Sequence, residues 1–182
     1  IRDRVLLNPG DEVLVPAPYW LSYPEMAALA GASTRIIPTK AEQGFRLDLD
    51  LLEQQITPRS RLLVINSPGN PSGQVMTRAE LEALAALVAR HPQLMVMSDE
   101  IYEYLLADGQ QHCSFAAIAE EIRSRCFTVN GFAKGWAMTG WRLGYLAGDA
   151  AVIKAASALQ SQSTSTVCSF AQRGALAAIE AP

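Results

Sequence analysis

Residues 61–66 read Arg-Leu-Leu-Val-Ile-Asn, and residues 94–98 read Leu-Met-Val-Met-Ser. Near-continuous apolar runs of this length are typical of strands that are buried on both faces of a parallel sheet. Between them, Thr77-Arg-Ala-Glu80 has the spacing of a helix capping box, and the amphipathic segment that follows extends to about Arg90, just before Pro92. The two runs and the intervening helix predict a βαβ unit.

Strands and helices alternate on both sides of this unit. Short apolar segments predict further strands at residues 12–15, 34–38, 126–130 and 143–147. Helices are expected at residues 1–7, 25–30, 50–56, 116–125, 149–160 and 167–180. This alternation predicts an α/β fold with three layers, in which helices cover both faces of the sheet.

Two of the shorter helices also begin with capping-box spacing. Ser22 stands three residues before Glu25, and Asp50 stands three residues before Glu53. We therefore expect Ser22 and Asp50 to be N-caps, and Gly31 to end the first of these helices.

The composition is that of a globular protein, long enough at 182 residues for one domain with a sizeable core. The net charge of −3 argues against nucleic acid or an anionic membrane as a partner, because both favour a basic surface. Neither a signal peptide nor a membrane-spanning run is expected. The three cysteines form no metal-binding pattern and two histidines are too few for a His-based metal site, so we expect no metal and free thiols in a reducing cytoplasm.

Polar or aromatic residues follow four of the predicted strands at the point where each strand ends. They are Tyr19 and Trp20, then Asn66 with the turn at residues 67–73, then Asp99, Glu100 and Tyr102, and finally Lys134. In open α/β sheets, ligands bind beyond the carboxyl ends of the strands. We therefore expect these side chains to meet at one edge of the sheet and to form the active site there.

Residues 130–145 read Asn-Gly-Phe-Ala-Lys-Gly-Trp-Ala-Met-Thr-Gly-Trp-Arg-Leu-Gly-Tyr and place Lys134 among small and apolar residues. Such surroundings are expected to strip water from the ammonium group and to lower the pKa of Lys134. A lysine that forms a Schiff base must be available as the neutral amine. The alternative is that Lys134 is a solvated residue of a glycine-rich turn.

The run from Gly131 to Gly144 resembles the lysine signature of the class I and II aminotransferases of fold type I, which use pyridoxal 5′-phosphate (PLP). Residues 16–25, 66–73 and 98–103 are similar to further segments of this family, in the order and rough spacing of its bacterial aspartate aminotransferase subgroup. The resemblance covers essentially the whole chain. It implies a mostly parallel sheet and a large PLP-binding domain, of which residues 1–182 form a fragment truncated at both ends.

The resemblance also implies a set of six cofactor-binding side chains: Trp20, Asn70, Asp99, Tyr102, Lys134 and Arg142. Lys134 would carry the internal aldimine and then act as general base, and Arg142 would bind the phosphate. Asp99 would keep the pyridine nitrogen protonated, so that the cofactor can act as an electron sink. Asn70 and Tyr102 would stabilise the phenolic oxygen, and Trp20 would stack on the ring. Lys134, Asp99 and Tyr102 would be the catalytic members.

Each of these residues also has a purely structural interpretation. Asp99 fits a helix N-cap or a turn, and Asn70 lies in a segment made of turn-forming residues. Tyr102 and Trp20 fit an apolar core, and Arg142 fits a surface ion pair.

Two departures from the family pattern bear on function. Ala133 stands where the family often has a serine that helps to bind the phosphate, and the loss of that hydrogen bond is expected to cost about 1 to 3 kcal/mol. The phosphate loop and the small domain with the arginine that binds the substrate carboxylate are expected to lie outside residues 1–182.

Three functions are compatible with these residues. The first is an aminotransferase that moves an amino group between an L-amino acid such as aspartate and a 2-oxo acid, in a homodimer. The second is another fold type I PLP enzyme, such as a C–S lyase or a cyclopropane-forming synthase. The third is a PLP-binding module without turnover.

Overall fold

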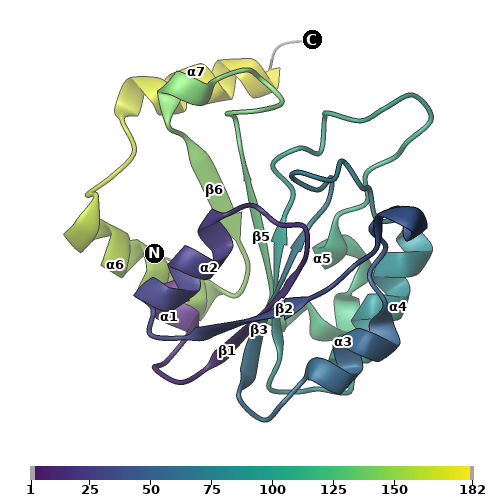
Figure 1. The fold of residues 1–182 in the computed structure, drawn as a ribbon. Helices are drawn as coiled ribbons and strands as arrows, with labels where there is room; N and C mark the ends of the chain where they lie inside the picture. Colours follow the sequence, from purple (N-terminus) through teal and green to yellow (C-terminus); the bar gives the residue numbers. More distant parts are fainter. Residues whose placement is uncertain (1–2, 181–182) are drawn as a thin grey trace.

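The computed structural model describes residues 3–180, which are organised around a six-stranded sheet (Figure 1). The strands lie in the order β2 (Ser33–Ile37), β1 (Glu12–Pro16), β3 (Ser60–Asn66), β4 (Met95–Asp99), β5 (Cys126–Gly131) and β6 (Gly144–Ala147). All neighbouring strands pair in parallel except β5 and β6, which are antiparallel. The predicted strands and the mostly parallel sheet are confirmed.

Helices cover both faces of this sheet, which confirms the three-layer architecture (Figure 1). One face is covered by α3 (Leu49–Gln55), α4 (Arg78–Ala89) and α5 (Phe115–Ile118). The other face is covered by α1 (Asp3–Leu6), α2 (Ser22–Leu29) and α6 (Ala150–Ser163). Residues 1 and 2 of the predicted first helix lie outside the described residues.

The helix α7 (Ser169–Glu180) lies apart from these layers, beyond the carboxyl end of β5. Ala175 and Ala178 of α7 pack against Phe132 and Met138, which flank Lys134 in the sequence. The helix therefore supports the loop that carries the lysine.

Strand β3 shows why the apolar runs predicted the sheet correctly. Leu62 and Val64 belong to the core cluster on one face, whereas Leu63 and Ile65 belong to the cluster on the other face. All four side chains are at most 3% exposed. Burying each side chain of this kind contributes about 1.5 to 3 kcal/mol, so the strand is held on both faces.

Only one of the three predicted capping boxes forms. The Thr77 hydroxyl accepts a hydrogen bond from the Glu80 amide, and the Glu80 carboxylate accepts one from the Thr77 amide. The helix α3 is capped by Asp48, which accepts from the Leu51 amide at 3.0 Å, and not by Asp50. Asp48 has the extended backbone that an N-cap requires, with φ −79° and ψ 110°, whereas Asp50 already lies in the first turn.

The predicted cap at Ser22 is wrong because α2 begins at Ser22 itself, and the preceding Leu21 makes no side-chain cap. Pro24 falls in the first turn of this helix, where its missing N–H leaves no hydrogen bond unmade. Gly31 follows the helix with a φ of 78°, as expected for a helix terminus.

The single helix predicted for residues 116–125 is also wrong. It is divided into α5 and a 3₁₀ segment, η2 (Glu120–Arg125), with Ala119 at φ −86° and ψ 55° between them. Phe115, Ala119 and Ile122 are all at most 2% exposed. Packing of these three side chains against the sheet overrides the helical preference of the alanine-rich segment.

Two general expectations can be compared with this fold. Cys113, Cys126 and Cys168 are all free. Within residues 3–180, none of the helices has both the length and the apolar character needed to cross a membrane.

The buried carboxylate of Glu12 links several residues at the end of the sheet where the parallel strands begin. Glu12 is 3% exposed and lies at the start of β1. It accepts hydrogen bonds from Thr57 at 2.6 Å, from Arg59 at 2.9 Å and from Arg35 at 3.1 Å. The hydrogen bond from Thr57, together with the two guanidinium groups, lowers the pKa of Glu12 to about 2 although burial opposes this shift. The charged form of Glu12 therefore stabilises the folded state.

We predict that Glu12→Gln reduces the acid sensitivity of the protein. Because the folded-state pKa lies below the ordinary value of 4.5, the stabilisation is complete above that pH and is lost as the pH falls toward 2. A shift of one pKa unit corresponds to about 1.4 kcal/mol. Between these pH values the free energy of unfolding of the wild-type protein should therefore fall by about 2 to 3 kcal/mol more than that of the variant. Denaturant unfolding at several pH values measures this difference. Glu42→Gln, at an exposed position, is the control, and parallel curves for wild type and Glu12→Gln would contradict the assignment.

Candidate functional site

A cavity of about 450 Å³ opens at the carboxyl ends of β3, β4 and β5. Its lining includes all six residues predicted as a cofactor-binding set: Trp20, Asn70, Asp99, Tyr102, Lys134 and Arg142. These residues are separated by up to 122 positions in the sequence, and the parallel sheet brings them together. A volume of this size is typical of sites for small molecules and cofactors.

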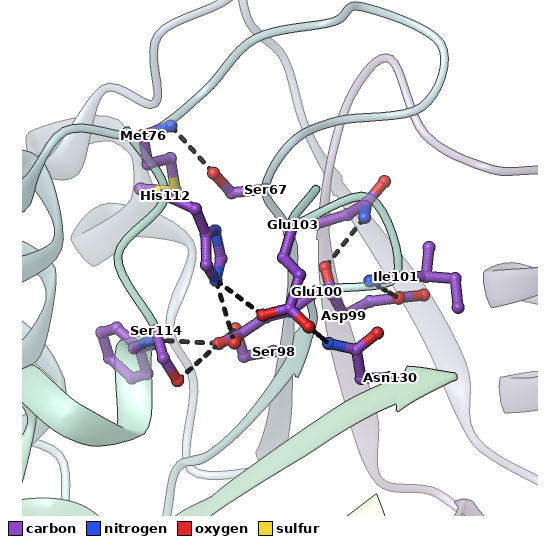
Figure 2. Close-up of polar contacts among 12 residues, drawn as sticks. Ser67, Met76, Ser98, Asp99, Glu100, Ile101, Glu103, His112, Ser114 and Asn130 are labelled. Atoms are coloured by element: carbon purple, nitrogen blue, oxygen red, sulfur yellow. Dashed lines mark hydrogen bonds and ion pairs between the residues drawn. The ribbon is translucent and has the colours of Figure 1, made fainter. Parts of the chain in front are cut away.

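Asp99 is the buried anion of the cavity wall. It is the last residue of β4 and is 7% exposed. Its Oδ2 accepts a hydrogen bond from the Tyr23 hydroxyl at 2.8 Å. Its Oδ1 accepts one from the Ile101 amide at 3.2 Å (Figure 2). Donors to both oxygens fix the orientation of this carboxylate.

The turn at residues 67–73 is held to β4 by Asn66. The Asn66 amide group donates to the Asp99 carbonyl at 2.9 Å, and its Oδ1 accepts from the Asn70 amide at 2.7 Å. The side chain at the end of β3 therefore ties Asn70 to the strand that carries Asp99. Asn70 has a turn conformation and also lines the cavity, so the two interpretations of this residue are compatible.

Lys134 enters the cavity from the loop after β5. Its Nζ lies 5.5 Å from the centre of the Tyr102 ring, within the range of a cation–π contact. The expectation that apolar neighbours strip water from Lys134 is wrong, because the residue is exposed. Phe132 and Met138 pack toward α7, which leaves the lysine directed away from that small apolar cluster.

Arg142 is the second cation of the cavity. It has a φ of 51°, in the left-handed region, and one guanidinium nitrogen donates to the Thr139 carbonyl at 2.7 Å. Among residues 3–180 it forms no ion pair, so the surface ion pair considered for it is not found. The remaining N–H groups of a planar fork can bind an anion such as a phosphate.

Trp20 lies on the wall of the cavity and not in the core. It is 45% exposed, and its ring meets Tyr23 edge to face with centroids 5.5 Å apart. An aromatic face that remains accessible beside a cavity can stack on a flat ligand.

Sequence reasoning missed Tyr23 and Thr139, and it misplaced Tyr19 and Glu100. Tyr23 lines the cavity and binds Asp99. No local pattern reveals this role, because the hydrogen bond to Asp99 spans 76 positions in the sequence. Thr139 also lines the cavity, and so does Asn66, which was expected at this edge. Tyr19 was expected there too but packs against the core cluster beneath α2. Glu100 was expected at the same edge, but its side chain belongs to a separate cluster described below.

The cavity thus combines an amine, a buried carboxylate, a guanidinium group and an aromatic face. The two cations, Lys134 and Arg142, come from the segment after β5, whereas the anion comes from β4. This distribution suits a ligand that is itself dipolar, with an anionic group at one side and a basic group at the other.

Comparison with known proteins places this site in context. The family model for aminotransferase class I and II matches residues 2–182. A protein from Petunia hybrida, named as a bifunctional aspartate aminotransferase and glutamate/aspartate-prephenate aminotransferase, is 53% identical over 94% of this chain and 36% of its own length. An aspartate/prephenate aminotransferase from Cereibacter sphaeroides is 48% identical over 97% of this chain and 44% of its own length.

Solved structures give the same result. The aspartate aminotransferase from Rhizobium meliloti is 39% identical and superposes with a TM-score of 0.97, over 100% of this chain and 45% of that structure. The aspartate aminotransferase from Thermus thermophilus with maleate is 46% identical, with a TM-score of 0.89 over 94% and 44% of the two chains. The chain spans less than half the length of these proteins.

We predict that Tyr23→Phe destabilises the protein by about 1 to 3 kcal/mol, because a buried carboxylate then loses a hydrogen-bond donor. The measurement is the free energy of unfolding in urea. Tyr19→Phe is the matched control, since the described part of the chain offers the Tyr19 hydroxyl no hydrogen bond. Equal stability of the two variants would contradict the importance of the Tyr23–Asp99 contact.

Proposed function

Because the chain belongs to the aminotransferase class I and II family, we propose that it is the catalytic, PLP-binding part of a transaminase. The amino group would pass between an aspartate-like L-amino acid and a 2-oxo acid, a choice supported by the names of the relatives. The observation that carries the proposal is the convergence of Lys134, Asp99 and Arg142 on one cavity.

The donor set of this cavity fits PLP, the cofactor that the family implies. Asp99 offers a fixed, buried carboxylate to a protonated ring nitrogen. Arg142 offers free guanidinium N–H groups to a phosphate, and Lys134 offers an accessible amine to an aldehyde. In our proposal, Trp20 covers the ring face and Asn70 with Tyr102 faces the phenolic oxygen. When bound, PLP supplies an electron sink for the carbanion that forms as the substrate α-proton leaves.

The residues of the chain would then have distinct tasks. Lys134 Nζ would hold the cofactor through its aldehyde and, once freed by the amino group of the substrate, would act as general base for the α-proton. Asp99 keeps a proton on the ring nitrogen, and its two donors hold the carboxylate in place throughout. Tyr102, whose ring lies 5.5 Å from Lys134 Nζ, limits the positions that the amine can reach.

We further propose that residues 1–182 are the central part of the large domain of a longer, homodimeric and cytoplasmic enzyme. The shares of 36% and 44% of the relatives' lengths support a longer protein. Exposed apolar side chains on α7, among them Phe170 at 70% and Ile179 at 60%, support a further contact surface there. The three free cysteines fit a reducing compartment. The phosphate loop and the small domain would lie outside this chain.

Two other functions share the same cavity. A C–S lyase or a cyclopropane-forming synthase would use Lys134 and Asp99 alike but release different products. A PLP-binding module without turnover would bind the cofactor and exchange no amino group. Aspartate aminotransferases among both the relatives and the solved structures favour the transaminase.

We predict that the protein that carries this chain transfers the amino group of aspartate to a 2-oxo acid. Lys134→Ala should lower the rate of this transfer by at least about a thousandfold. General acid–base catalysis alone contributes about 10² to 10⁴, and Lys134 would also be the attachment point. Chromatography of the products after incubation with PLP measures the exchange. Lys154→Ala, at an exposed position on α6, is the control.

The products separate the alternatives. Exchange of the amino group supports the transaminase. Incubation with a β-thioether amino acid that yields pyruvate, ammonia and a thiol, or with a γ-sulfonium amino acid that yields a cyclopropane product and a thioether, would replace it by one of the other enzymes. PLP binding without any product would indicate the non-catalytic module.

A further inference from the structure

A second cluster of titratable groups lies behind the cavity and has no part in the proposed chemistry. Glu100, Glu103 and His112 bring their ligand atoms within 4.8 Å of one another (Figure 2). His112 Nε2 lies 3.2 Å from Glu100 Oε2 and 4.0 Å from Glu103 Oε2. Both glutamates come from the turn that follows β4, directly beside Asp99 and Tyr102.

Glu100 is the fixed point of this cluster. It is 3% exposed, and its Oε1 accepts hydrogen bonds from Ser98 at 2.8 Å, from Ser114 at 3.1 Å and from the Phe115 amide at 3.1 Å. Burial raises the pKa of Glu100, but the hydrogen bonds from His112, Ser98 and the Phe115 amide outweigh it and hold the pKa below its usual value. A buried carboxylate with this many donors has little freedom to move.

The hydrogen bonds favour an ionic network here over a metal site. The Nδ1 atom of His112 is buried and has no partner among residues 3–180, whereas a metal-bound histidine usually donates its other ring N–H to an acceptor. The Oε1 atom of Glu100 is already surrounded by three donors. A histidine between two carboxylates instead links them through its Nε2 atom.

Glu103 connects this network to the loop that carries Lys134. Its Oε1 accepts a hydrogen bond from the Asn130 side chain at 2.7 Å (Figure 2). Asn130 Oδ1 in turn accepts one from the Gly131 amide at 2.7 Å. At Gly131 the backbone is crowded, since a Cβ there would lie 2.9 Å from both the Gly144 Cα and the Leu143 carbonyl. The last residues of β5 are therefore held on both sides.

The same turn touches the lysine loop with its aromatic side chains. Tyr102 lies against Lys134, with 5.5 Å from Nζ to the ring centre. Tyr104 covers Gly135, where a Cβ would approach the Tyr104 ring to 2.7 Å, and its ring meets Trp136 with centroids 4.7 Å apart. A shift of the turn would therefore move the lysine.

We propose that Glu103 is a positioning residue for Lys134: through Asn130 it fixes the start of the lysine loop, and through His112 it is anchored to buried Glu100. This inference rests on the proposed function, because the position of Lys134 matters for activity only if this lysine reacts with PLP. Glu103 acts through its neighbours and is not assigned a contact with the ligand, since it is absent from the cavity lining.

The test compares two ligands that differ in the group that Lys134 meets. PLP carries the aldehyde and can be trapped on the lysine with borohydride, whereas pyridoxamine 5′-phosphate carries an amine and binds without covalent attachment. The protein that carries this chain is titrated with both ligands as wild type, Glu103→Ala, Glu103→Gln and Asn130→Ala. Glu121→Ala, at an exposed position, is the matched control.

We expect Glu103→Ala and Asn130→Ala to weaken covalent attachment of PLP about tenfold or more, because each removes the hydrogen bond to the start of the loop. Their affinity for pyridoxamine 5′-phosphate should stay within about twofold of wild type. Glu103→Gln should remain close to wild type, since its amide oxygen still accepts from Asn130. Combining Glu103→Ala with Asn130→Ala should weaken covalent attachment of PLP no more than either substitution alone, as expected of two residues that act as a unit.

Each other outcome contradicts the proposal. Unchanged PLP attachment in both alanine variants would mean that Glu103 does not position Lys134. Equal weakening of both ligands would mean that the network shapes the whole cavity and not the lysine. If the protein that carries this chain binds neither ligand, the proposed function itself fails, which distinguishes that failure from failure of this inference. If Glu103→Ala does not fold, Asn130→Ala and Glu103→Gln still decide the matter.

Discussion

Asp99 is an anion that the end of β4 withdraws from water, and such a group is stable only where donors surround it. Tyr23 of α2 and the Ile101 amide supply these donors, and Asn66 at the end of β3 holds the carbonyl of the same residue. The hydrogen bonds to Asp99 therefore connect a helix, two strands and a turn. The cavity forms where these elements meet.

The parallel sheet explains why the other groups lie at the same place. Strands β3, β4 and β5 end side by side, so that Asn70, Tyr102 and Lys134 enter one space from three successive loops. The antiparallel β6 returns the chain beside β5 and brings Arg142 near Lys134. The Glu100 network behind the cavity then couples the turn after β4 to the loop after β5.

The fold could be predicted well wherever burial on both faces determines the residue type. Strand β3 is the clearest case, because every interior position must be apolar whatever its neighbours are. Local signals were less reliable: Asp48 and Asp50 both suit an N-cap, and only the backbone conformation decides between them. The break at Ala119 could not be predicted, because it depends on contacts with residues far away in the sequence.

The candidate site likewise combines features that the sequence predicts with features that depend on contacts between distant parts of the chain. The six cofactor-binding candidates followed from a family resemblance and from the rule on strand ends, and all six line the cavity. The environment of Lys134 was predicted wrongly, since apolar neighbours in the sequence pack toward α7 and leave the lysine exposed. Tyr23 and the Glu103–Asn130 link depend on side chains that meet across the fold, 76 and 27 positions apart, and no local pattern reveals them.

The identity of the lysine that reacts with PLP tests the central claim most directly. The chain contains three lysines, Lys40, Lys134 and Lys154, and all three are exposed, so accessibility alone does not favour any one of them. The chain is incubated with PLP, reduced with borohydride and digested, and the labelled peptide is identified by mass spectrometry. The account predicts a label confined to Lys134. A label shared among the three lysines, or located on Lys40 or Lys154, would contradict it.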